Sequence, residues 1–201
     1  MDATVRVSKL VVARDDYLRD VPTCYDEPLE EVASRVADSG SIGKSDIGTL
    51  LFWKRLRADT AWAARLLRLP DSEVRRRTTP VVAAATDPRV SVVDAARTAR
   101  RLLVDLPGMK KGDALASALL CAAAPARLAI YDSRAQRGLA LVELELSDAA
   151  GRYSRYLALI EQCRTELAGA GLAWRAREVD LALFQLGRPS SGRTARVPLA
   201  Q

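Results

Sequence analysis

The sequence predicts an all-α protein, and three observations support this fold class. Apolar residues make up 49% of the 201 residues, which is enough for a substantial core. Alanine and leucine, both strong helix formers, dominate that set. Aromatic residues are only 5%, and no segment shows the period-two alternation of a half-buried strand. The length favours one domain, which we place at 44–187, preceded by a small annex at 1–43.

The N-terminal half contains several helix signals and one exception. Val5 to Val12 is expected to form a short extended segment. Pro28 is expected to start the first helix, because its fixed φ suits a first turn. Ser45 is a typical N-cap residue for the second helix. Pro80 is expected to break or kink the fourth helix before it continues to Thr86.

The C-terminal half has clearer helix boundaries. Ser91 and Asp94 resemble a capping box in which aspartate replaces the usual glutamate. Asp132 is a second expected N-cap. Residues 188–201 combine Pro, Ser, Gly and Arg, and we expect a disordered basic tail there. The expected helices are 28–38, 46–57, 59–69, 71–86, 92–105, 111–123, 133–145, 147–168 and 173–186.

The charge balance bears on the class of partner. The net charge is +6 and the isoelectric point is about 9.5. A basic protein favours polyanions such as DNA, RNA or an acidic membrane surface. The alternative is that an Arg- and Ala-rich composition merely reflects a GC-rich genome. The location of the charges therefore matters more than their sum.

Residue usage excludes several kinds of chemistry. Histidine is absent, which excludes Ser–His–Asp and Cys–His catalysis and His-ligated metals. Cys24, Cys121 and Cys163 are too far apart for a zinc or iron–sulfur motif, and the last two are expected to be core thiols. We therefore expect no metal and no cofactor. Without a signal peptide or a long apolar run, the expected location is the cytoplasm, with no membrane partner. The oligomeric state stays open.

A tight basic turn between two helices is the most informative motif. Its sequence is Leu-Pro-Gly-Met-Lys-Lys-Gly, residues 106–112. Pro107 fixes φ and Gly108 permits a positive φ. The following backbone N–H groups, with Lys110 and Lys111, could hold a nucleic-acid phosphate. The alternative is an ordinary helical hairpin whose lysines are solvated.

A single carboxylate follows that turn after one apolar helix. It is Asp132, in the sequence Ile-Tyr-Asp-Ser-Arg at 130–134. A carboxylate at this place could stabilise positive charge on a sugar held nearby. The alternative role is that of a helix cap, and the two roles are compatible.

Together, the turn and the carboxylate resemble the helix–hairpin–helix DNA glycosylase superfamily over about residues 44–187. In that family a Leu-Pro-Gly turn precedes an apolar helix and a catalytic aspartate. The resemblance implies that Asp132 assists hydrolysis of the N-glycosidic bond of a damaged base, such as an oxidised purine, extruded from duplex DNA. It also implies that residues 107–112 contact DNA. Residues 174–184 are similar to the closing helix of a bacterial group related to 8-oxoguanine glycosylases.

Two departures from the family pattern limit the implied chemistry. Lys110 replaces the second turn glycine, and Gly112 stands where the family's Schiff-base lysine would be. Lys111, one residue away, is the nearest candidate for that catalytic amine. Without an amine in that position, a covalent imine and strand cleavage are not expected. The resemblance thus implies a monofunctional base-excision enzyme.

Three further residues are candidates for the site. Tyr131 and Trp53 could form a base pocket, although core packing is the usual role of such rings. Arg134 could contact a phosphate or a base, or simply be solvated. The runner-up function is a non-catalytic DNA-binding relative. A third interpretation is an unrelated helical interaction protein, and the sequence does not distinguish DNA from RNA.

Overall fold

The protein is all-α over residues 1–189, the part of the chain that the computed structural model describes. No strand occurs in this range. The helices are α1 (Ala3–Asp20), α2 (Glu27–Ser39), α3 (Lys44–Trp53), α4 (Ala61–Leu67), α5 (Asp71–Thr86), α6 (Val92–Leu102), α7 (Ala114–Ala123), α8 (Ser133–Leu141), α9 (Arg152–Gly169) and α10 (Ala176–Leu186), with short 3-10 turns η1 (Thr23–Asp26) and η2 (Leu103–Asp105).

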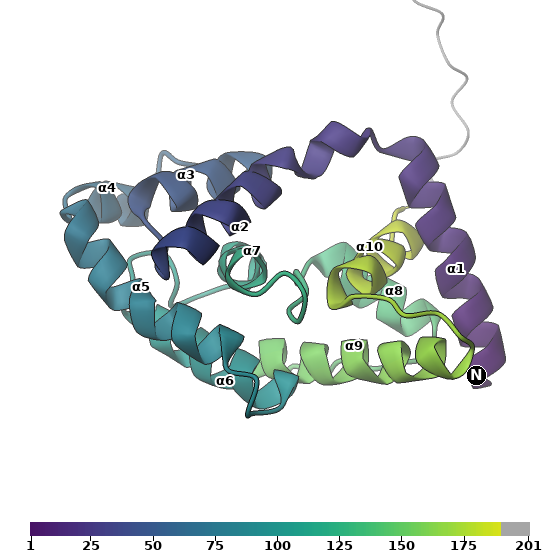
Figure 1. Ribbon diagram of the computed structural model, residues 1–201. Helices are drawn as coiled ribbons and strands as arrows, with labels where there is room; N and C mark the ends of the chain where they lie inside the picture. The colour runs from purple at the N-terminus through teal and green to yellow at the C-terminus, as the bar shows by residue number, and fades with distance from the viewer. Residues whose placement is uncertain (190–201) are drawn as a thin grey trace, which may run out of the picture.

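Helix α7 is the centre of the fold. All its residues from Leu115 to Ala123 are buried, as its almost entirely apolar sequence requires. Helices α2, α3, α5 and α6 pack around it, and α6 also packs against α9 (Figure 1). Helix α10 packs between α8 and α1 on the other side of the molecule. Cys121 on α7 and Cys163 on α9 are core thiols, as expected.

The predicted extended segment at Val5 to Val12 is wrong, because this stretch belongs to α1. The buried positions of α1 are Arg6, Leu10, Ala13 and Tyr17, which recur with helical spacing. The β-branched valines between them obscured this pattern: Val5 and Val12 are exposed, whereas Val7 and Val11 are partly buried against the core. Helix α1 therefore contributes to the same hydrophobic core as the rest of the chain.

Two helix starts differ from the prediction for identifiable reasons. Helix α3 begins at Lys44, and its N-cap is Gly43 rather than Ser45. The carboxylate of Asp46 accepts the backbone N–H of Gly43 at 2.8 Å, which closes the first turn. Helix α7 begins three residues later than expected, because Gly112 adopts a φ of +79° that a helix does not tolerate.

Two further expectations concern a helix interior and a helix start. Pro80 lies inside α5 without ending it, whereas Gly151, with φ +75°, delays the start of α9. Ser91 is confirmed as a cap, since its hydroxyl accepts the N–H of Asp94 at 3.1 Å.

The predicted disordered tail lies, from residue 190 on, outside the described residues. None of the helices up to residue 189 is both long and apolar enough to span a bilayer.

Candidate functional site

The structure contains a cavity of about 640 Å³. Its wall is built by the C-terminal end of α1, the η1 turn, the end of α3, the start of α8 and one face of α10. In Figure 1 these elements surround the space between α7 and α1. The cavity falls within the size range of small-molecule sites in proteins.

The segment that leads into α8 is held in place by side chains from three helices. The backbone N–H of Ile130 donates to Asp180 of α10 at 2.6 Å. The N–H of Tyr131 donates to the hydroxyl of Ser117 on α7 at 3.0 Å, and Tyr153 of α9 donates to the carbonyl of Ala129 at 2.8 Å. These buried bonds fix the backbone immediately before Asp132, so this carboxylate enters the cavity from a rigid support.

Asp132 lies in the cavity wall and caps α8. One carboxylate oxygen accepts the N–H of Arg134 at 2.8 Å, which confirms the predicted cap. The other accepts the ammonium of Lys54 at 3.1 Å. Burial alone would raise the pKa of Asp132, but the Arg134 N–H and the Lys54 charge outweigh it, so the pKa lies below its usual value. Asp132 is therefore an ionised carboxylate at neutral pH.

Lys54 is one of the site residues that the sequence did not reveal. It follows directly after α3 and is separated from Asp132 by 78 positions in the chain. Its ammonium also lies 5.7 Å from the ring centre of Trp53. In the sequence it read only as one polar position in an apolar stripe. A lysine next to a tryptophan, inside the helix expected at 46–57, was the available signal, and it was weak.

A second ion-pair cluster adjoins the cavity and contributes Arg177 and Asp180 to its wall. Arg177 donates to Asp180 at 2.5 Å and to Asp26 at 3.0 Å. Burial raises the pKa of Asp180 to about 6, although Arg177 and the N–H of Ile130 act in the opposite direction. Because Asp180 also holds Ile130, this pair supports the segment that carries Asp132.

Aromatic rings line the cavity, but not all of the expected ones. Trp53 is in the wall, where its indole N–H donates to the carbonyl of Tyr25 at 2.9 Å and its ring faces Arg177. Tyr131 is not part of the wall: its ring packs edge-on against Tyr156 in the core. Tyr25 and Phe184, which the sequence did not single out for the site, line the cavity instead.

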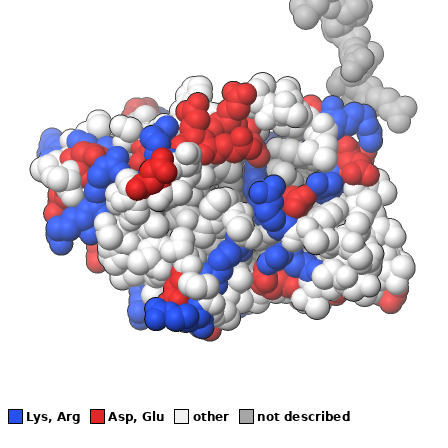
Figure 2. Space-filling view, viewed as in Figure 1, with Lys and Arg blue, Asp and Glu red and all other residues white. Residues whose placement is uncertain are grey.

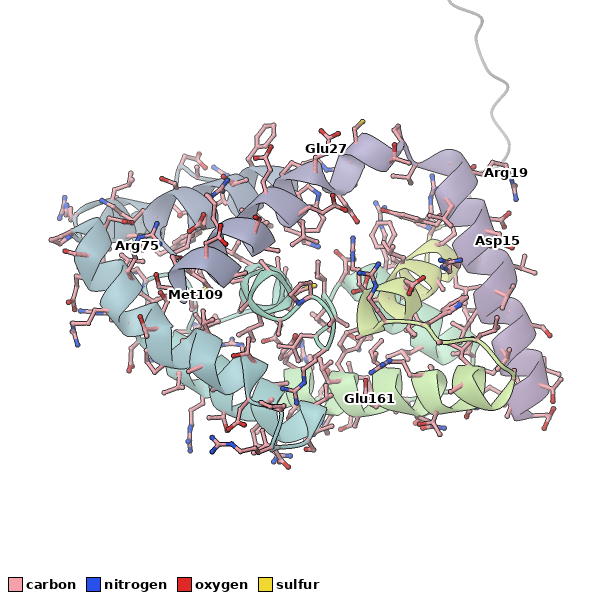
Figure 3. The ribbon with its side chains drawn as sticks, viewed as in Figure 1. Asp15, Arg19, Glu27, Arg75, Met109 and Glu161 are labelled. Atoms are coloured by element: carbon pink, nitrogen blue, oxygen red, sulfur yellow. The ribbon has the colours of Figure 1, made fainter. Side chains whose placement is uncertain are left out.

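The 106–109 segment forms a hydrogen-bonded turn in which the N–H of Met109 donates to the carbonyl of Leu106 at 3.1 Å. Pro107 occupies its second position and Gly108, with φ +88°, its third, as in a type II turn. Leu106 and Met109 are buried, and Figure 3 shows Met109 close to α5. The turn thus has the geometry that its sequence predicts.

The cations of the turn lie outside the cavity. Lys110, Lys111 and Gly112 are exposed, and none of them, nor Pro107 or Gly108, is part of the cavity wall. The structure therefore places Asp132, Arg134 and Trp53 together, and leaves Lys111 apart from them. Arg100 is held within the hairpin, where it donates to Asp113 at 2.9 Å and to the carbonyl of Gly112 at 3.0 Å.

The turn provides a stability test with a built-in comparison. A Cβ on Gly108 would lie 2.3 Å from a ring atom of Trp62, whereas a Cβ on Gly112 meets nothing within 4 Å. Both glycines have positive φ, so alanine costs about 1 kcal/mol of backbone strain at either position. Gly108→Ala adds overpacking of roughly 1–3 kcal/mol. Urea unfolding should therefore show Gly108→Ala to be clearly less stable than Gly112→Ala; equal losses would contradict this packing.

The surface around the cavity carries both signs of charge. Figure 2 shows basic side chains around the hollow on the α1 side of α7, and acidic side chains over α2. A polyanion would thus be attracted to the cavity mouth and repelled from the neighbouring α2 surface.

Neither metal ligation nor similarity to known proteins assigns the site. Within residues 1–189 no group of three or more Cys, Asp or Glu side chains is arranged to hold a metal ion. Comparison of the chain with protein-family models, curated proteins and solved structures finds no match.

Proposed function

We propose that this protein is a DNA glycosylase-like enzyme that hydrolyses the N-glycosidic bond of a damaged base, such as an oxidised purine. One observation carries the proposal: the ionised carboxylate of Asp132 lies on a rigid segment in the wall of a cavity lined by aromatic rings and cations. The resemblance of residues 106–112 and 130–134 to helix–hairpin–helix glycosylases supports it.

The proposed chemistry needs only a carboxylate and water. As the bond between C1′ of the sugar and the base nitrogen breaks, its electron pair leaves with the base and positive charge develops on the sugar. Asp132 stabilises that charge. Water then adds to C1′ and loses a proton, and the base gains one, so the products are a free base and an abasic site. A carboxylate whose pKa is lowered remains ionised for this role.

The other cavity residues would hold the extruded nucleotide. Tyr25, Trp53 and Phe184 offer aromatic surface to a base that has left the stack. Lys54 orients Asp132 through its ion pair. Outside the cavity, the exposed Lys110 and Lys111 of the turn would contact backbone phosphates without reading sequence.

The runner-up is a protein that binds DNA without cutting the glycosidic bond. It is favoured by the fact that both oxygens of Asp132 already have structural partners, in Lys54 and the N–H of Arg134. The absence of an amine at Gly112 agrees with either function, because a monofunctional glycosylase needs none.

The experiment that separates the two is base release from duplex oligonucleotides that carry a panel of lesions, with 8-oxoguanine first. Alkali reveals the abasic sites. Release of a base by the wild-type protein supports the enzyme. Salt-dependent DNA binding without release from any lesion would overturn the enzyme and leave the binding protein.

Removing the charge of Lys54 should shift the pH dependence of base release. Because the Lys54 ammonium lowers the pKa of Asp132, Lys54→Met raises that pKa. Asp132 must be ionised to act, so the acid limb of the rate profile moves to higher pH. Single-turnover rates between pH 4 and 8 measure this shift. Lys44→Met, at the other end of α3, is the control and should leave the limb in place; an unmoved limb in Lys54→Met would refute the coupling.

A further inference from the structure

The cations in the cavity wall fall into two groups. Three of them are paired with carboxylates: Lys54 with Asp132, Arg177 with Asp180 and Asp26, and Arg188 with Asp20. Two others, Arg55 and Arg134, form no ion pair with any carboxylate of residues 1–189. The wall therefore carries two uncompensated positive charges on the side chains next to the Lys54–Asp132 pair.

Arg134 belongs to the same helix start as Asp132. It lies in the first turn of α8, two residues after the cap, and its guanidinium carbon is 5.1 Å from the ring centre of Phe184. This cation–π contact holds the side chain against the cavity wall but leaves its N–H donors without a carboxylate. The N-terminal end of α8 adds partial positive charge at the same place.

Arg55 is adjacent in the chain to the other member of the Lys54–Asp132 ion pair, one residue after Lys54. Its φ of +52° lies in the left-handed region, where a residue with a Cβ is strained and glycine is not. Its side chain is exposed, and its longest-range contact is a weak 3.4 Å approach to the hydroxyl of Tyr25. Nothing in the packing of residues 1–189 explains why a long cation stands where glycine would fit better.

An approaching phosphodiester accounts for both arginines. If a sugar lies against Asp132, the phosphates on its two sides come near a carboxylate that repels them. Arg134, which follows Asp132, and Arg55, which follows its partner Lys54, would offset that repulsion and bind phosphate oxygens in bidentate fashion. Paired cations such as Arg177 are not free to do so.

We propose that Arg55 and Arg134 bind the two phosphates that flank the nucleotide seated at Asp132, so that the cavity mouth is a phosphodiester clamp. The inference rests on the proposed function for the placement of the sugar. It goes beyond it in assigning the polyanion contact to the cavity mouth, with the 106–112 turn as a separate contact.

The test is the salt dependence of DNA binding. The probe is a duplex with one tetrahydrofuran abasic analogue, which no glycosylase can process. Each lost phosphate contact should reduce the slope of log K against log salt by about 0.9. Arg55→Gly and Arg134→Gln should each show this reduction, and the double variant about 1.8. The control is Arg57→Gln, which changes the net charge equally but removes an arginine already paired with Asp59.

Stability separates a binding role from a structural one. Arg55→Gly relieves the positive φ, so its melting temperature should equal or exceed that of the wild type while its binding slope falls. A wild-type slope in both variants, or an equal loss in Arg57→Gln, would overturn the clamp. Base release by the wild type is a separate readout. Release with unchanged binding slopes in the variants would refute the clamp alone. Reduced binding slopes without base release would refute the enzyme alone.

Discussion

Replacing Asp132 with asparagine is expected to slow base release roughly 100- to 1000-fold, the usual cost of removing one preorganised electrostatic group from an active site. The amide has almost the same shape but cannot supply the negative charge that stabilises a developing sugar cation. Asparagine is as good an N-cap as aspartate, so the bond to the N–H of Arg134 and the start of α8 should persist. Single-turnover release from the best lesion substrate measures the effect.

The matched control is Asp20→Asn. Asp20 is also a carboxylate of the cavity wall, and it is paired with Arg188 at 3.1 Å, but it lies at the end of α1 rather than beside Asp132. Its rate should stay near that of the wild type. If Asp132→Asn keeps full activity with an unchanged melting temperature, Asp132 is only a helix cap.

The second large effect concerns Gly138, where α8 packs closely against α10. A Cβ at this position would lie 2.0 Å from the backbone carbonyl oxygen of Leu183, which no side-chain rotation can relieve. Gly138→Ala should therefore cost at least about 2 kcal/mol, near the upper range of overpacking effects. Since α8 carries Asp132 at its start, any folded fraction should also release base more slowly.

Gly48→Ala should change the stability in the opposite direction, although Gly48 also lies inside a helix. Gly48 lies in α3 and is exposed, and a Cβ at this position would meet nothing within 4 Å, so alanine should stabilise the helix by up to about 1 kcal/mol. Chemical unfolding of the two variants should give shifts of opposite sign. A neutral Gly138→Ala would mean that α8 and α10 lie further apart than their close approach at Leu183 implies.

The fold class could be predicted because composition and helical periodicity are local properties. The apolar run from 114 to 123 gave the central helix, and Ser91 and Asp132 gave two caps. The errors came from places where local signals compete. In α1 the valines favoured an extended chain, but burial of Leu10 and Ala13 against the core decides for a helix.

The part of the site that is predicted best is the motif whose residues are close in sequence. Asp132 and Arg134 lie in one motif, and the structure brings them into one wall with Trp53. Lys54 could not be predicted as their partner, because it is 78 positions away from Asp132 in the chain and only the tertiary fold brings the two side chains together. Tyr131 shows the converse: adjacency in the chain suggested the pocket, but the extended backbone at Asp132 directs the tyrosine ring into the core.

If Asp132 stabilises positive charge on a sugar bound in this cavity, that effect can be tested without knowing which lesion the protein recognises. The measurement compares the dissociation constants of two duplexes, one with a pyrrolidine abasic analogue, whose ring nitrogen is cationic, and one with the neutral tetrahydrofuran analogue. Transition-state mimics bind at least about 100-fold more tightly than ground-state ligands in many enzymes. We expect a clear preference for the cation that disappears in Asp132→Asn. Equal affinity for both duplexes, or a preference that survives in Asp132→Asn, would contradict this role of Asp132.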